Sequence, residues 1–160
     1  MAKRKEKKLN AMRVLEQHGV PYEVFEFSED IHSAVGVAEA VGVAPDTVYK
    51  TLVTLKPDGK PVLVLAPGPA TLDLKALAAA LGEKKMSMAP HAEAEKLTGL
   101  KVGGISPLAL VQKRWPIVLD SSAEAHEAIL LSAGQRGVNL RVPVAGLRAI
   151  LQPPIARVTQ

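Results

Sequence analysis

The sequence predicts one α+β domain with a mixed, mostly antiparallel, barrel-like sheet flanked by helices. Its 160 residues are 48% hydrophobic, which suffices for a single core and leaves no room for a second full domain. Segments with strand patterns are joined by tight turns, which favours hairpins. Helical and strand segments do not alternate regularly, as a doubly wound parallel sheet would require.

The N-terminal part of the chain predicts two helices and one strand. Apolar residues at helical spacing predict a helix over residues 9–18, ended by Gly19. Residues 20–27 are rich in aromatic and β-branched side chains and predict a strand. Ser33 is suited to cap a short helix that ends at Gly42.

The middle of the chain predicts a hairpin followed by a helix. Residues 48–55 and 61–66 are strand-like, and the five residues between them contain Asp-Gly, a strong turn signal. Asp73 can cap a helix with one apolar stripe that ends at Gly82.

The rest of the chain predicts a helix over residues 90–97 and an irregular loop over 102–107, because paired glycines followed by Ser-Pro favour a sharp loop. Residues 134–137 are glycine-flanked and predict a turn between two strands. Three strands and a final short helix are predicted at residues 117–120, 128–132, 138–142 and 147–151.

Positive charge is concentrated in a basic tail, residues 1–8, ahead of a domain over residues 9–160. The tail holds five basic residues and one acidic residue, which accounts for the whole net charge of +4. Such a tail either neutralises nucleic-acid phosphates or is a solvated terminus. Because no apolar stretch of secretory length follows it, we expect a cytoplasmic protein without a membrane segment.

Several kinds of chemistry are excluded by composition and spacing. The chain has no cysteine, so it can form neither a disulfide nor a thiolate metal site, and it has no cysteine nucleophile. Residues 104–108 resemble a nucleophile elbow, but Leu108 replaces its second glycine. We expect no metal and no cofactor, because none of the histidines has metal-ligand spacing: His18, His32, His91 and His126.

Lys50 is the first candidate for a functional residue. In the strand over residues 48–55, a period of two puts Lys50 on the face of Val48 and Leu52. One interpretation is an edge-strand lysine that reaches to water. The other is a cationic anchor for a phosphate or a developing oxyanion.

Two glycine-rich segments are the second candidate. Gly103 and Gly104 lack side chains, so their backbone amides could approach a ligand carbonyl as an oxyanion hole requires. Ser132 and the turn at residues 134–137, with Arg136, could line the same cavity. Tight turns explain both segments equally well.

Four segments resemble the YbaK/EbsC family of aminoacyl-tRNA deacylases, which is similar to the editing insertion domain of bacterial prolyl-tRNA synthetases. They follow the family's order within residues 10–150. The segments are residues 48–52, 72–82, 98–107 and 132–137.

The resemblance implies a compact α+β fold and a free-standing factor that hydrolyses mischarged Cys-tRNA(Pro), and by extension Cys-tRNA(Cys). A synthetase pocket separates proline poorly from cysteine, which has a similar volume, so a second sieve is needed. The alternatives are a deacylase for another small amino acid, as in Ala-tRNA(Pro), and a non-catalytic tRNA- or synthetase-binding module. The implied partners are the tRNA acceptor end and prolyl-tRNA synthetase.

The resemblance also implies roles for individual residues. The expected catalytic residues are Lys50, Gly103 and Gly104. The expected substrate-binding residues are Thr51, Ser132, Phe27, Asn139 and Arg136. Family members often have a tyrosine in place of Phe27 and an aspartate in place of Asn139. Since the chain offers no strong nucleophile of its own, the resemblance points to the thiol of the cysteinyl ester as the attacking group.

Overall fold

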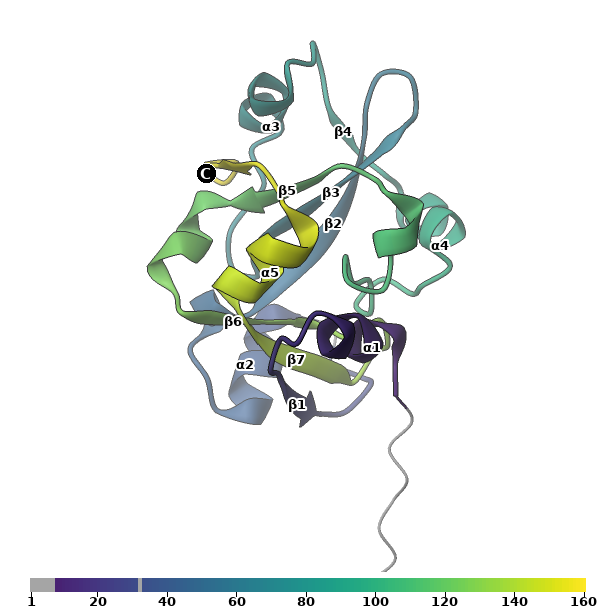
Figure 1. Ribbon diagram of the computed structural model, residues 1–160. Coiled ribbons are helices and arrows are strands. Elements are labelled where there is room, and N and C mark those ends of the chain that lie inside the picture. Colours follow the sequence, from purple (N-terminus) through teal and green to yellow (C-terminus); the bar gives the residue numbers. More distant parts are fainter. Residues whose placement is uncertain (1–7, 32) are drawn as a thin grey trace, which may run out of the picture.

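The computed structural model describes residues 8–31 and 33–160; residues 1–7 of the predicted basic tail and His32 lie outside the described residues. Within this part of the chain, five α-helices pack around two sheets (Figure 1). The helices are α1 Asn10–Gln17, α2 Ala34–Val41, α3 Leu74–Leu81, α4 His91–Thr98 and α5 Val144–Leu151. The strands are β1 Glu23–Glu26, β2 Tyr49–Leu55, β3 Pro61–Pro67, β4 Ser87–Met88, β5 Ile117–Asp120, β6 Ala128–Ser132, β7 Val138–Pro143 and β8 Ile155–Ala156.

The strands form a three-stranded sheet in the order β1-β7-β6 and a five-stranded sheet in the order β4-β2-β3-β5-β8. All pairs are antiparallel except β3 with β5 and β5 with β8. The predicted α+β class with a mixed, mostly antiparallel sheet is confirmed. The strands do not close into one barrel; instead, a parallel bridge between Val48 and Leu130 joins the two sheets.

The predicted hairpin and helix caps are confirmed. Strands β2 and β3 pair along their whole length, with Leu55 opposite Pro61 at the turn. The Ser33 hydroxyl accepts a hydrogen bond from the Gly36 amide at 3.0 Å, so it caps α2 as predicted. Asp73 caps α3 in the same way, through the amide of Ala76 at 3.0 Å.

Some element boundaries differ from the predictions. Strand β1 covers only half of the predicted residues 20–27, because the Val20 amide donates to Leu15 O at 2.9 Å and completes the end of α1. Helix α5 begins at Val144, directly after Pro143, which is three residues earlier than predicted. Strands β4 and β8 were not predicted, because two residues are too few to show a period.

The core positions the region where the two sheets meet. A cluster that includes Leu15, Leu131 and Leu147 packs α1 and α5 against strands of both sheets. A second cluster, with Val37 of α2, covers the bridge between Val48 and Leu130. Each fully buried leucine stabilises the fold by about 1.5–3 kcal/mol, so the junction has a well-anchored frame.

Candidate functional site

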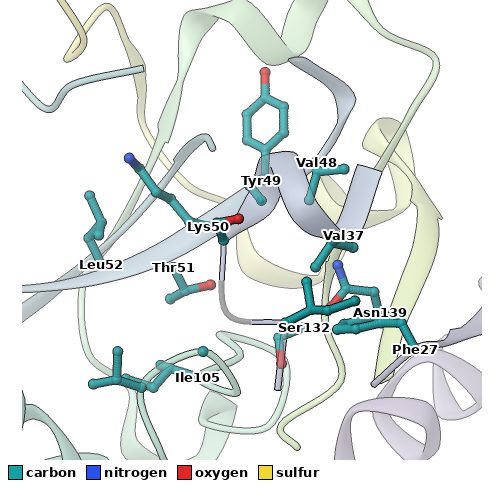
Figure 2. A pocket seen from close by; sticks show the side chains of 15 residues that line it. Phe27, Val37, Val48, Tyr49, Lys50, Thr51, Leu52, Ile105, Ser132 and Asn139 are labelled. Atoms are coloured by element: carbon teal, nitrogen blue, oxygen red, sulfur yellow. The ribbon is translucent and has the colours of Figure 1, made fainter. Parts of the chain in front are cut away.

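A cavity of about 190 Å³ lies at the junction of the two sheets (Figure 2). It gathers side chains from β2, β6, β7 and α2 with the loop that follows α4. Six of the eight predicted site residues line it: Phe27, Lys50, Thr51, Gly103, Ser132 and Asn139. Gly104 and Arg136 are not among its lining residues. Sequence reasoning did not single out the apolar residues that complete the wall, such as Ile31, Val37 and Ile105.

Strand register brings two polar side chains of the three-stranded sheet into the cavity. Ser132 on β6 lies directly opposite Asn139 on β7, and both residues are buried. The Ser132 hydroxyl accepts from the Gly134 amide at 3.2 Å, which leaves its hydrogen free to donate. Within residues 8–31 and 33–160, the side-chain amide of Asn139 makes no hydrogen bond. Both groups are therefore available to a ligand.

Thr51 is placed on an open edge of β2. On that edge β4 pairs only with Thr54 and Leu55. The Val53 carbonyl points toward the β4 side, where it accepts from the Ala89 amide at 3.0 Å. Because residues two apart in a strand direct their N–H and C=O to the same side, the N–H and C=O of Thr51 also point toward the β4 side. The Thr51 hydroxyl is buried and lacks a partner among the described residues. A buried unpaired hydroxyl is costly, which suggests that a ligand satisfies it.

Lys50 has a different orientation from Thr51. Its Nζ donates to Gly68 O at 3.0 Å and to Ala70 O at 2.7 Å. In Figure 2 the amine points away from the hydroxyls of Thr51 and Ser132. Burial lowers the pKa of the Lys50 ammonium. The lysine thus fastens β2 to the segment after β3 and keeps one N–H donor free among the described residues.

The two glycines of the 102–104 loop have different roles. Gly103 has φ +93°, a conformation that glycine adopts without strain, and its amide has no partner in the described part of the chain. The Gly104 amide instead donates to Lys101 O at 2.7 Å. A Cβ on Gly104 would lie 2.8 Å from the Arg136 backbone nitrogen. Gly103 is therefore the available amide donor, and Gly104 permits the close approach of two loops.

Two charged side chains hold this loop from opposite sides. The Val102 amide donates to Glu95 Oε2 on α4 at 2.8 Å, and the Val102 carbonyl accepts from Arg136 Nε at 2.8 Å. Arg136 thus contacts the loop that carries Gly103 without lining the cavity itself. Sequence reasoning missed Glu95, because a bond from a side chain to a distant backbone amide leaves no motif.

A buried hydrogen-bond chain supports β2 from behind. The Tyr49 hydroxyl lies 2.7 Å from the Ser122 hydroxyl, which donates to Asp120 Oδ2 at 2.5 Å. Since the only hydroxyl hydrogen of Ser122 is used on the carboxylate, Tyr49 is the donor to Ser122. Burial raises the pKa of Tyr49. Its hydroxyl points away from the cavity in Figure 2, so the residue acts on the position of the strand.

The described residues contain neither a candidate metal site nor a helix suited to a membrane. Among the described residues, no three His, Asp or Glu side chains are grouped so that they could hold a metal ion. No helix in the described ranges is long and apolar enough to cross a membrane.

Comparison with known proteins identifies the family. Residues 28–150 match the model of the aminoacyl-tRNA editing domain. The chain is 41% identical over 162 residues to EbsC of Enterococcus faecalis, and the match covers 99% of this chain and 98% of that protein. That relative is named as a candidate Cys-tRNA(Pro)/Cys-tRNA(Cys) deacylase.

Two solved structures share the fold. The crystal structure of the hypothetical protein APE2540 has a TM-score of 0.87 at 21% identity, covering 94% of this chain and 99% of that one. A candidate trans-editing enzyme for prolyl-tRNA synthetase has a TM-score of 0.78 at 24% identity, covering 97% and 99%. With the family model matching most of its length, the chain belongs to the aminoacyl-tRNA editing domain family.

Proposed function

We propose that this protein is a deacylase that removes cysteine from mischarged Cys-tRNA(Pro), with Cys-tRNA(Cys) as a second substrate. The observation that carries the proposal is the junction cavity, which places unpaired polar groups of Thr51, Asn139 and Gly103 around one small space. The name of the 41% identical relative supports the choice of substrate.

The size of the cavity favours a small aminoacyl group. Its volume of about 190 Å³ is below the range of roughly 300–1,000 Å³ typical of sites for drug-sized ligands. Apolar walls from Val37, Ile105 and Phe27 suit a compact, weakly polar side chain such as that of cysteine. The Gly103 amide, in the cavity lining, is the donor that can stabilise the oxyanion of the ester.

The attacking group is the thiol of the substrate. The chain contains no cysteine. Among residues 8–31 and 33–160, the cavity lining includes neither a carboxylate nor a histidine that could activate the hydroxyls of Thr51 and Ser132. A cysteine thiol has a pKa of about 8.5 and is nucleophilic near neutral pH. The thiolate attacks its own ester carbonyl, the bond to the ribose oxygen breaks, and that oxygen takes up a proton. The product is a cyclic thioester, which water then opens.

Lys50 supplies a positive charge to the lining of the cavity. Its remaining N–H can donate to a phosphate of the acceptor end or to the ester. The two carbonyl contacts hold the side chain in place before the substrate arrives, which reduces the entropy lost on binding.

A panel of charged tRNAs tests the proposal. One tRNA(Pro) is charged with cysteine, S-methylcysteine, serine or alanine, and single-turnover deacylation is measured. Cysteine should be released fastest, and S-methylation should abolish the reaction, because the nucleophile is blocked. Equal rates for all four would contradict thiol attack and indicate a positioned water. Faster release of alanine would favour Ala-tRNA(Pro) as the substrate, and tRNA binding without any release would indicate a non-catalytic module.

The proposed partners are the tRNA acceptor end and prolyl-tRNA synthetase. A synthetase that holds the mischarged tRNA would present its acceptor end to the cavity and raise the effective concentration of substrate. Adding the synthetase should therefore increase the deacylation rate at low tRNA concentration. A rate unaffected by the synthetase would contradict the partnership and leave the deacylase activity unaffected.

A further inference from the structure

A second cavity, of about 480 Å³, lies beside the first. Its lining includes Glu29 and Asp30, which follow Phe27 of the first cavity, and Lys101, which precedes Val102 of the first cavity. The two spaces therefore run along the same two chain segments, residues 27–31 and 99–103. A ligand seated in the first cavity by one end can continue into the second.

Arg136 is the residue that connects the two cavities. It lines the second cavity, and its Nε is bonded to the Val102 carbonyl. Its two terminal nitrogens have no hydrogen-bond or ion-pair partner in the part of the chain that the structure describes. A guanidinium with a free pair of parallel donors fits two oxygens of one phosphate. Lys101 adds a second positive charge to the lining.

The other charges of the second cavity are negative. Glu29 and Asp30 come from the segment after β1, whereas the cations come from the loops after α4 and β6. Carboxylates accept hydrogen bonds from an amino group or a hydroxyl and repel an anion. The matching ligand has an anionic group near Arg136 and hydrogen-bond donors elsewhere. A nucleotide with an exocyclic amine has this chemistry, and carboxylates are suited to the amine of cytosine.

We propose that the second cavity binds the cytidine that precedes the terminal adenosine of the tRNA acceptor end. The phosphate between these two nucleotides contacts the terminal nitrogens of Arg136, and the cytosine amine contacts the carboxylates of Glu29 or Asp30. This inference rests on the proposed deacylase function, because it assumes that the cysteinyl ester of the terminal adenosine occupies the first cavity.

The geometry also links binding of the phosphate to the position of the 102–104 loop. The guanidinium that holds the phosphate is the one whose Nε holds Val102, the residue before Gly103. A phosphate on the terminal nitrogens restricts the guanidinium and with it the direction of the Gly103 amide. The acceptor end therefore contributes to the assembly of its own site.

The test uses a hairpin RNA that carries the acceptor stem and is charged with cysteine. The phosphate between the last two nucleotides is replaced by a neutral methylphosphonate, and a stem phosphate is replaced in a control RNA. The terminal replacement should slow single-turnover deacylation by the wild-type protein roughly tenfold to a hundredfold, as expected for a charge-assisted hydrogen bond, and the stem replacement should have little effect.

The decisive variant is Arg136→Ala. On the normal RNA it should lose at least as much rate as the wild type loses on the methylphosphonate, because it also loses the hydrogen bond to Val102. The methylphosphonate should cost the variant nothing further. Arg136→Lys keeps the charge but not the paired donors, so it should recover only part of the rate. Arg148→Ala, which changes an exposed arginine on α5, is the matched control. An equal methylphosphonate penalty in the wild type and in Arg136→Ala would overturn the assignment of Arg136.

Binding of the uncharged hairpin, measured by fluorescence anisotropy, separates this inference from the proposed function. If no charged RNA is deacylated but Arg136→Ala still removes the methylphosphonate penalty on affinity, the deacylase function fails and the nucleotide site stands. Replacing the penultimate cytidine by uridine should weaken binding, and Glu29→Gln with Asp30→Asn should reduce that preference. An unchanged preference would overturn the role of the carboxylates.

Discussion

The two walls of the junction cavity are built in different ways. The wall that carries Lys50 and Thr51 belongs to β2, which is fixed along its length by the ladder to β3. The opposite wall is a loop around Gly103, held at Val102 by one side chain on each side, Glu95 and Arg136. A backbone ladder survives the loss of a single side chain, whereas a loop held by two side chains does not. We therefore expect mutations of the strand to act on chemistry and those of the loop to act on geometry.

The largest effect is expected at the strand wall, from Lys50→Ala. The variant should fold, because the β2–β3 ladder does not depend on this side chain, but it should lose deacylation by about a hundredfold or more. Circular dichroism and single-turnover rates measure the two properties. Lys75→Ala, on the exposed surface of α3, is the control and should be active. A folded Lys50→Ala protein with the wild-type rate would remove Lys50 from the mechanism.

The next largest effect should come from the loop wall, through Gly104→Val. The new side chain would start 2.8 Å from the Arg136 nitrogen and 3.0 Å from the Gln135 carbonyl carbon, so one of the two loops must move. The deacylation rate should fall by more than the melting temperature accounts for. Gly59→Val is a useful comparison, because its φ of +84° makes it strained but no atom lies within 4 Å of its Cβ. If Gly59→Val reduced the rate equally, general destabilisation of the fold and not displacement of these two loops would be the cause.

Glu95→Ala should have a smaller effect on the same loop. Losing a hydrogen bond from a carboxylate to the Val102 amide should lower kcat about tenfold and change the affinity for uncharged tRNA little. Glu95→Gln should restore most of the rate, because its side-chain oxygen can still accept from that amide. Glu93→Ala, on the exposed part of α4, serves as the control. A loss confined to KM, or no rescue by Gln, would argue against a positioning role for Glu95.

The smallest effect is expected on the stability of the protein at alkaline pH, through the titration of Tyr49 and Lys50 on β2. Burial raises the pKa of Tyr49, so its contribution to stability is complete below the unfolded pKa of about 10 and is lost as pH rises through the folded pKa. Burial lowers the pKa of Lys50, so its titration raises stability between its folded pKa and its unfolded pKa of about 10.5. Urea unfolding at several alkaline pH values should show a shallower decline in Tyr49→Phe than in the wild type. A decline of the same slope would mean that Tyr49 does not contribute to it.

Local features of the fold could be predicted from the sequence because neighbouring residues decide them. The Ser33 and Asp73 caps and the hairpin between β2 and β3 each depend on residues within a few positions of one another. The resemblance also pointed to six of the residues that line the cavity. It indicated which residues lie in the site, but not the direction of their side chains.

Only the tertiary structure decided those directions. It turned the Lys50 amine toward the carbonyls of Gly68 and Ala70, and it committed the Gly104 amide to a turn. It also brought Arg136 to Val102 across 34 positions of sequence, and Tyr49 to Ser122 across 73. Contacts of this kind have no period and no spacing rule, because they depend on how separate elements pack. The sequence by itself therefore determined most of the elements, the family and six residues of the candidate site, while packing determined which atoms of those residues are free to meet a substrate.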